Sequence, residues 1–258
     1  MSPPHSHFTE PTTNYWQRIL PAPPPSSPAT PPYKFSYPAP LPDSRILLLP
    51  IRPLAANPEH AVASLLVNHA SLSVVNELGA MLAQRVRELA PDVEVLVGVP
   101  TLGLCVAPIV VQALGLGAFP LLGLSLRRSS NFRATVSERY VPLGYSLKFW
   151  YCETLSAGVS SITSPGVGLK RVYLDPNLLP LVVGKRVVII DDAVSSGRTL
   201  KATWDLLEGV GCKVEGVGVV MRQGTEWRAL LGEEKAGRVV SVLESPLLRA
   251  MEEGWGLR

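Results

Sequence analysis

The feature that most constrains this chain is the stretch VVIIDDAVSSGRTL at residues 187–200. It opens with four β-branched residues, which favour a strand buried on both faces of a parallel sheet. Two adjacent carboxylates follow, Asp191 and Asp192, and a loop of small residues then leads into a helix-like segment. Because loop amides and the positive end of a helix dipole attract anions, this order of elements predicts a phosphate-binding site.

The acid pair places a second requirement on that site. Carboxylates repel phosphate, so the pair is expected to face neutral or cationic groups, and both sugar hydroxyls and Mg²⁺ fit. In the loop, Ser195, Ser196 and Thr199 can add hydroxyl donors, and Gly197 lets the chain turn tightly against a ligand. The alternative is an ordinary strand-to-helix turn of an α/β protein, but paired acids followed by this loop are rare by chance.

With these features in view, the stretch resembles the phosphoribosyl pyrophosphate (PRPP) signature of type I phosphoribosyltransferases. That signature is an apolar strand, two acids, a variable pair, Thr, Gly, any residue and Thr. Ser196 stands where Thr is usual and keeps the hydroxyl, and Arg198 fills the freely variable position. The resemblance covers about residue 45 to the C-terminus. It implies an α/β fold with an open, mainly parallel sheet, helices on both faces, a flexible flap and a small hood.

The chain resembles the purine (xanthine/adenine) branch of this family. The resemblance implies transfer of 5-phosphoribose from PRPP to a purine base, release of pyrophosphate and use of Mg²⁺. In this reading Asp191 and Asp192 are the catalytic acids, which hold the ribose hydroxyls and can contact the metal. The 5′-phosphate would be held by the loop residues Ala193, Val194, Ser195, Ser196, Gly197, Arg198 and Thr199.

A second loop is expected to face the pyrophosphate. Residues 93–99 predict a strand and residues 104–114 a helix, and the family places its pyrophosphate loop between such elements. Since Pro100 has no N–H, the role would fall on the amides of Thr101, Leu102 and Gly103. A plain strand–helix loop is the alternative.

A basic pair, Arg127 and Arg128, ends a further strand expected at residues 118–126. The family often has Arg-Lys at this place, reaching the pyrophosphate or the 5′ region. Arg128 in place of Lys keeps the charge but not the geometry. A solvated basic pair is the alternative.

The base contacts implied by the resemblance are Asn68, Arg222 and Gln223. Residues 58–68 are expected to be helical and to break at Asn68 before a second helix over residues 73–89. The break is similar to an Asn-His-Gln turn of the xanthine branch, although a helix cap explains Asn68 equally well. Gln223 stands where that branch has a Lys, which weakens the case for xanthine itself.

Residues 129–182 are expected to form the flap, with strands at 144–153 and 156–163. A closing flap excludes water that would hydrolyse an activated ribose. The flap lacks the Lys-rich character of the orotate branch, and its Tyr145-Ser146 pair is similar to the flaps of the xanthine and adenine enzymes. With the flap included, the resemblance implies a phosphoribosyltransferase domain over residues 45–258.

Residues 1–44 hold about half of the chain's 25 prolines and predict a largely disordered tail. A linker and a docking site for a proline-recognising domain are both open, and its aromatic residues, including Tyr15, Trp16 and Tyr33, suggest that parts of it pack onto the domain.

Composition and charge limit the classes of ligand and partner that the chain is expected to bind. A net charge of +3 is too weak to indicate nucleic acid. The uncharged stretch at residues 95–126 contains three prolines, which favours buried elements over a membrane span. Scattered cysteines favour reduced, buried thiols in a cytoplasmic protein. The expected ligands are therefore PRPP and a nucleobase, with neither nucleic acid nor membrane, and a homodimer is expected because dimers are common in the family. A catalytically silent PRPP-binding regulator or scaffold is the alternative function.

Overall fold

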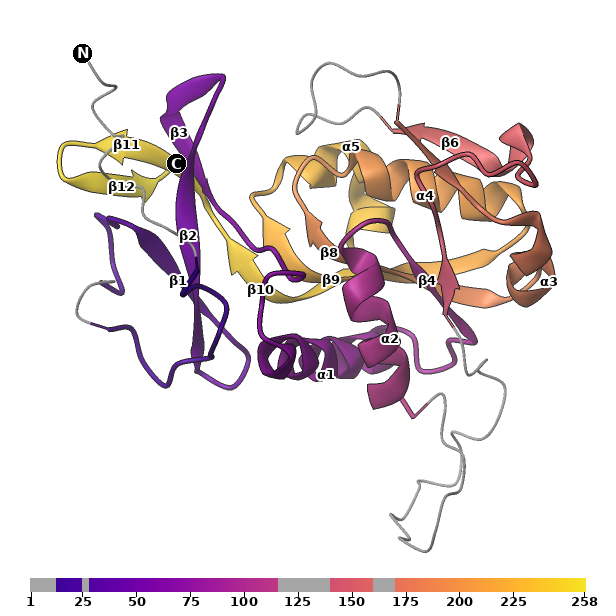
Figure 1. Ribbon diagram of the computed structural model, residues 1–258, viewed down its shortest axis with the longest axis horizontal. Helices are drawn as coiled ribbons and strands as arrows, with labels where there is room; N and C mark the ends of the chain where they lie inside the picture. Colours follow the sequence, from indigo (N-terminus) through magenta and orange to yellow (C-terminus); the bar gives the residue numbers. More distant parts are fainter. Residues whose placement is uncertain (1–12, 25–27, 116–139, 160–169) are drawn as a thin grey trace, which may run out of the picture.

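The core of the molecule is a parallel sheet with the signature strand at its centre (Figure 1). The computed structural model describes residues 13–24, 28–115, 140–159 and 170–258. Within these residues the sheet has five strands in the order β10-β9-β8-β4-β5, and every neighbouring pair is parallel. The strands are β4 (Val95–Gly98), β5 (Val141–Pro142), β8 (Arg186–Val194), β9 (Lys213–Gln223) and β10 (Val239–Ser245).

Helices cover both faces of this sheet because β8 is apolar on both sides. Val188 and Ile190 join an apolar cluster with α1 (Leu72–Leu89) and α2 (Gly103–Ala113). Val187 and Ile189 join the cluster that contains α4 (Arg198–Gly209) and α5 (Glu226–Ala236). All four β8 side chains are fully buried, and their alternation follows the two-residue period of a strand. The predicted α/β fold is confirmed.

A second, antiparallel sheet, which we call the hood, lies beside the core (Figure 1). Strand β10 ends at Ser245 and the chain enters the hood at Leu247, so the hood stands at the carboxyl end of the parallel strands. Its order is β1-β2-β3-β11-β12. The strands are β1 (Ser36–Pro40), β2 (Ile46–Leu54), β3 (Asn57–Ala63), β11 (Leu247–Met251) and β12 (Gly254–Leu257).

The prediction of a helix over residues 58–68 is wrong. Residues 57–63 form β3, which pairs with β2 on one side and β11 on the other. The partner β11 lies almost two hundred residues further along the chain, so only the folded sheet supplies the bonds that favour a strand here. The second predicted helix is present as α1, capped by the Ser71 hydroxyl, which accepts from the Val74 N–H at 3.3 Å.

The N-terminal segment differs from the expected disordered tail wherever the structure describes it. Tyr15, Trp16 and Tyr33 are buried, and Ser36–Pro40 is the edge strand of the hood. Backbone bonds join Leu20 to Ile46 in both directions at 2.8–2.9 Å. The expected packing of tail aromatics is therefore present, because burial of these rings offsets the ordering of a proline-rich segment.

The flap region is only partly as expected. Strand β6 (Ser156–Val159) pairs with β7 (Lys170–Tyr173). The prediction of a strand at residues 144–153 is wrong. After the bridge between Gly144 and Tyr173 these residues are irregular, and they lead into the short helix η2 (Glu153–Leu155). Leu147 and Phe149 are exposed there, so no apolar face holds a strand in place. Residues 129–139 and 160–169 of the predicted flap, and the predicted strand at 118–126, lie outside the described residues. The short helices η3 (Pro176–Leu178) and α3 (Leu179–Val182) lead from β7 to β8.

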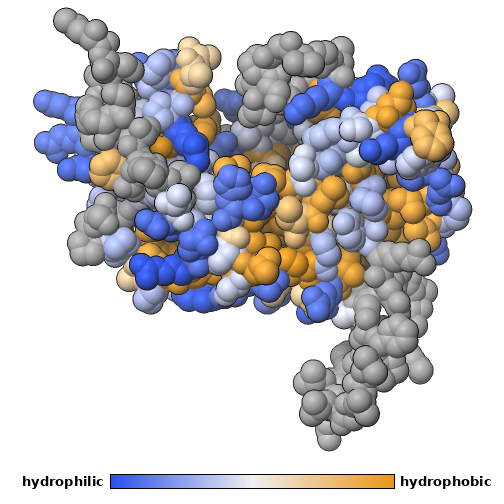
Figure 2. Space-filling view, in the orientation of Figure 1, coloured by the Kyte–Doolittle hydropathy of each residue, from blue (hydrophilic) through white to orange (hydrophobic). Residues whose placement is uncertain are grey.

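The uncharged stretch that begins at residue 95 supplies β4 and α2 rather than a single long helix. Figure 2 shows hydrophobic residues gathered in the lower middle of the visible face, where α1 and α2 lie in Figure 1. Among the described helices, none is both long and apolar enough to cross a membrane.

The three cysteines are unpaired, but only Cys212 is buried as expected. Cys105 is half-buried on α2. Cys152 is exposed, because it lies in the irregular segment before η2.

Candidate functional site

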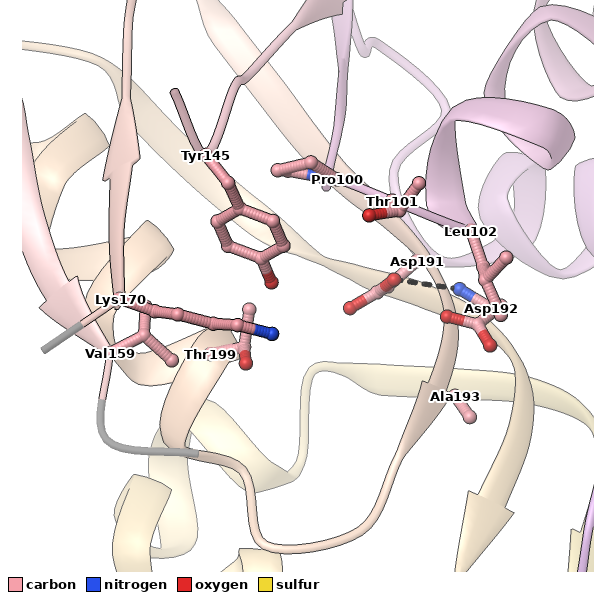
Figure 3. A pocket seen from close by; sticks show the side chains of 10 residues that line it. All are labelled: Pro100, Thr101, Leu102, Tyr145, Val159, Lys170, Asp191, Asp192, Ala193 and Thr199. Atoms are coloured by element: carbon pink, nitrogen blue, oxygen red, sulfur yellow. Dashed lines mark hydrogen bonds between the residues drawn. The ribbon is translucent and has the colours of Figure 1, made fainter. Parts of the chain in front are cut away.

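The acid pair stands where β8 reaches the carboxyl edge of the parallel sheet, the edge at which open α/β sheets bind ligands. Asp191 is only 6% exposed and Asp192 is half-buried. The Asp192 backbone N–H donates to Asp191 Oδ1 at 2.9 Å, which fixes the first carboxylate against the chain (Figure 3).

Burial changes the acidity of both carboxyl groups. It raises the pKa of Asp191 well above its ordinary value, and the negative charge of Asp192 raises it further. Burial also raises the pKa of Asp192. A pair held in this way favours ligands that donate hydrogen bonds or carry positive charge, such as ribose hydroxyls or a developing cation.

A cavity of about 340 Å³ opens beside the pair. Figure 3 shows its walls: the Pro100–Leu102 loop on one side of Asp191, and Tyr145, Lys170 and Thr199 on the other. The lining residues are Pro100, Thr101, Leu102, Tyr145, Val159, Lys170, Asp191, Asp192, Ala193 and Thr199. Predicted donor-site residues from two separate loops are thus brought together.

The signature loop turns into α4 through Gly197. Its φ is +76°, a left-handed conformation that glycine adopts without strain, and a Cβ there would lie 3.0 Å from the Trp227 Cβ. Trp227 is buried and its indole N–H donates to the Gly224 carbonyl at 3.1 Å. Thr199 in the first turn of α4 and Ala193 line the cavity. The positive end of this helix therefore faces the ligand space.

The second loop brings the start of α2 against β8. A Cβ on Gly103 would lie 2.7 Å from the Ile190 carbonyl oxygen and 2.9 Å from both Cα and Oδ1 of Asp191. Only glycine lets the two elements approach this closely. Leu102 is the N-cap residue of α2 and makes no side-chain capping hydrogen bond. Amides at the start of α2 thus remain for an anion beside the acid pair.

Tyr145 is a neutral donor in this cavity. Burial raises its pKa to about 12, with a further contribution from the charge of Asp191, and a hydrogen bond with Thr199 acts in the opposite direction. The phenol therefore keeps its proton at neutral pH. The side chain points into the cavity toward Thr199 (Figure 3).

The predicted base contacts are not among the residues that line the described cavity. Asn68 is exposed in the turn before α1. Arg222 forms an ion pair with Glu244, and the Gln223 amide donates to the Ala63 carbonyl at 3.1 Å. Arg127 and Arg128 lie outside the described residues.

Sequence reasoning missed Lys170 as a cavity residue. It stands at the start of β7, outside both predicted loops, and the bonds that join β7 to β6 and Tyr173 to Gly144 bring it to the site. A lysine at the start of a short strand is usually a solvated residue, so no local pattern distinguishes it.

Comparisons with known proteins agree with this layout. The model of the phosphoribosyl transferase domain matches residues 63–241, more than half of the chain. The adenine phosphoribosyltransferase of Nocardioides sp. is 29% identical over 180 residues, which cover 69% of this chain and 78% of that protein. The adenine phosphoribosyltransferase of Rippkaea orientalis is 46% identical over 99 residues, 37% of this chain and 55% of that protein.

The solved structures that it resembles carry similar names. The Saccharomyces cerevisiae adenine phosphoribosyltransferase, solved with adenine and an imino-altritol bisphosphate, covers 76% of this chain and 94% of its own. Its identity is 16% and its TM-score 0.48. The names of the sequence relatives agree with the predicted resemblance to the purine branch. With the signature on β8 and the family model matched across both loops, the chain belongs to the phosphoribosyltransferase family.

Proposed function

We propose that this protein transfers 5-phosphoribose from PRPP to a ring nitrogen of a purine and releases pyrophosphate. The observation that carries the proposal is the position of the acid pair. Asp191 and Asp192 face one cavity between the N-termini of α2 and α4. Two anion-binding helix ends with two carboxylates between them suit a donor that carries a phosphate at each end of a ribose.

Three parts of the site orient PRPP. Residues 193–199 bind the 5′-phosphate, the carboxylates accept from the ribose 2′ and 3′ hydroxyls, and the amides of Thr101, Leu102 and Gly103 face the pyrophosphate. Arg127 and Arg128 remain predicted pyrophosphate ligands. The bond from ribose C1 to pyrophosphate breaks as C1 gains positive charge, and C1 then bonds to the acceptor nitrogen, which gives up a proton. The carboxylates stabilise the cation by charge.

The donor set fits Mg²⁺ held mainly through the substrate. The described residues contain no group of three or more His, Cys, Asp or Glu side chains placed to hold a metal. The cavity supplies the two carboxylates, and Mg²⁺ commonly binds one or two carboxylates together with substrate phosphates. When bound, the ion would offset the charge of the departing pyrophosphate.

A purine acceptor is supported by the relatives, which are named adenine and hypoxanthine/guanine phosphoribosyltransferases. Asn68, Arg222 and Gln223 remain the predicted base contacts. They do not line the described cavity, but Arg222 and Gln223 end β9 beside Val194, at the same edge of the sheet as the acid pair, so a base next to the donor would lie near them. A homodimer and a cytoplasmic location remain predictions, and purine salvage is the role that this reaction would serve.

The test is pyrophosphate release with PRPP, Mg²⁺ and a panel of adenine, guanine, hypoxanthine, xanthine, orotate and uracil. We expect release with a purine. The double substitution Asp191→Ala/Asp192→Ala should abolish release while the protein stays folded by circular dichroism. Glu252→Ala/Glu253→Ala is the matched control, because it removes two consecutive acids that are exposed.

Two outcomes would contradict the proposal. Unchanged turnover in a folded Asp191/Asp192 double variant would remove its structural basis. Saturable PRPP binding without pyrophosphate release in the presence of any of these bases would favour the alternative of a catalytically silent PRPP-binding regulator or scaffold.

A further inference from the structure

The cavity beside the acid pair contains one cation among its described lining residues, Lys170 on β7. Its Nζ lies 5.3 Å from the centroid of the Tyr145 ring, within the range of a cation–π contact. Figure 3 shows the side chain extending below that ring toward Thr199. The ring thus holds a flexible side chain in an extended conformation that presents its ammonium group to the cavity.

Lys170 is not among the causes that shift the pKa of Asp191. Burial and the charge of Asp192 raise the pKa of Asp191, whereas a close ammonium partner would lower it. In Figure 3 the Lys170 ammonium group lies below the Tyr145 ring and beside Thr199, and the Asp192 carboxylate lies on the far side of Asp191. The positive charge is therefore directed at the part of the cavity next to the signature loop.

Three donors from three elements converge on that part of the cavity. Thr199 brings a hydroxyl group in the first turn of α4, Tyr145 brings a phenol that stays protonated because its pKa is about 12, and Lys170 brings the charge. Lysine is a point charge suited to phosphate, and charge-assisted bonds to phosphate oxygens are strong. A phosphate monoester dianion matches this set of groups.

Lys170 and Tyr145 also stand on one hydrogen-bonded unit. Gly144 and Tyr173 exchange two backbone bonds of 2.8 and 3.0 Å, which join the segment carrying Tyr145 to β7. The two side chains are therefore held in one mutual position by the backbone that carries them.

We propose that Lys170 binds the 5′-phosphate of PRPP from the β7 side, with Tyr145 beside it, so that the phosphate is held between β7 and the signature loop. This rests on the proposed function. The pyrophosphate end of the donor is assigned to Thr101 and Leu102, which lie across Asp191 from Lys170 (Figure 3). The two ends of the donor thus depend on different walls of the cavity.

The test is calorimetric binding of three probes, PRPP, ribose 5-phosphate and pyrophosphate, to the wild type and to Lys170→Met. Loss of a charge-assisted contact to phosphate should lower the affinity for ribose 5-phosphate and for PRPP by about 10- to 100-fold. Pyrophosphate binding should change less than about twofold, since its predicted ligands are elsewhere. In the transfer assay, KM for PRPP should rise with little change in kcat, and Lys170→Arg should keep part of the affinity.

Lys213→Met is the matched control. Lys213 is exposed at the amino end of β9, opposite the cavity edge, so its loss should leave all three affinities unchanged. Because Lys170 is itself an exposed residue, Lys170→Met should also keep the thermal midpoint of the wild type.

The outcomes separate this proposal from the proposed function. Equal affinity of the wild type and Lys170→Met for ribose 5-phosphate, or a loss confined to pyrophosphate, would overturn the Lys170 assignment and leave the transfer activity standing. A wild type that binds PRPP but transfers to no base would remove the transfer activity, and the ribose 5-phosphate comparison would still decide the role of Lys170. A wild type that binds neither PRPP nor ribose 5-phosphate would overturn both.

Discussion

Gly103 is where the fold and the acid pair constrain each other most directly, and Gly103→Ala tests that link. A Cβ at this position would lie 2.7 Å from the Ile190 carbonyl oxygen and 2.9 Å from the Cα of Asp191. Both atoms belong to the backbone of β8, the central strand of the sheet. Neither can rotate away, so the start of α2 and the end of β8 must separate.

The expected cost follows from this geometry. Forcing one extra methyl group into a close-packed contact costs about 1–3 kcal/mol. In a protein of this size, each kcal/mol lowers the Tm by about 2–4 °C, so a fall of about 2–12 °C is expected. The same Cβ would lie 2.9 Å from Asp191 Oδ1, so the carboxylate must shift as well. Displacement of a catalytic group by about 1 Å can lower the reaction rate about 100-fold, so kcat/KM for PRPP should fall by about 10- to 100-fold.

The assay pairs thermal unfolding with pyrophosphate release, and Gly209→Ala is the control. Gly209 also lies in a helix, α4, but a Cβ there would meet nothing within 4 Å. Alanine is the better helix former by about 1 kcal/mol, so Gly209→Ala should keep or raise the Tm. A Gly103→Ala variant with the Tm and kcat/KM of the wild type would refute the reasoning, and so would an equal loss in Gly209→Ala.

Two further predictions concern pH and the N-terminal segment. The pKa of Asp191 is raised above its ordinary 3.8, so the folded state binds the carboxyl proton more tightly than the unfolded state does. This difference stabilises the folded state fully below about pH 3.8, and the stabilisation is lost as pH rises through the pKa of the folded state. Asp191→Asn should therefore raise the Tm over the wild type more at about pH 8 than at about pH 5, and an equal gain at both would contradict this. Trp16 is 2% exposed and its indole N–H donates to the Ser64 carbonyl at 3.2 Å, so Trp16→Ala should cost about 3–5 kcal/mol in urea unfolding. Phe149→Ala, which removes a side chain from a residue that is 97% exposed, should cost far less, and similar losses in the two would argue against packing of the N-terminal segment.

The elements predicted correctly from the sequence depend on short-range patterns. The four β-branched residues of β8 and the apolar stripe of α1 each specify an element without reference to distant residues. The acid pair and its loop are equally local, and the structure brings Asp191, Asp192 and Thr199 to one cavity. These parts were predictable because strand, turn and helix N-terminus follow one another directly along the chain.

The parts predicted wrongly depend on long-range pairing. Strand β3 is held between β2 and β11, and the edge strand β1 is held by β2 together with the packing of Tyr33 and nearby aromatic residues. A proline-rich composition predicts a disordered tail, but the aromatic residues in it bury enough area to fold onto the hood. Lys170 was missed for a related reason, because its place at the cavity depends on the bonds that join β7 to β6 and Tyr173 to Gly144, which the local sequence does not indicate.

The contact between core and hood shows why the donor site is easier to predict than the acceptor contacts. The Ala63 carbonyl at the end of β3 accepts from Gln223 Nε2 at 3.1 Å and from Ser245 Oγ at 3.2 Å, so the ends of β9 and β10 meet the hood at one main-chain atom. Because the acceptor is a main-chain carbonyl, this anchor does not depend on the chemistry of a hood side chain. The donor site tolerates no such freedom, because the approach of Gly103 to Asp191 requires a residue without a Cβ. A family that shares one donor and differs in acceptor is therefore expected to keep a recognisable signature on β8 and to vary in the hood.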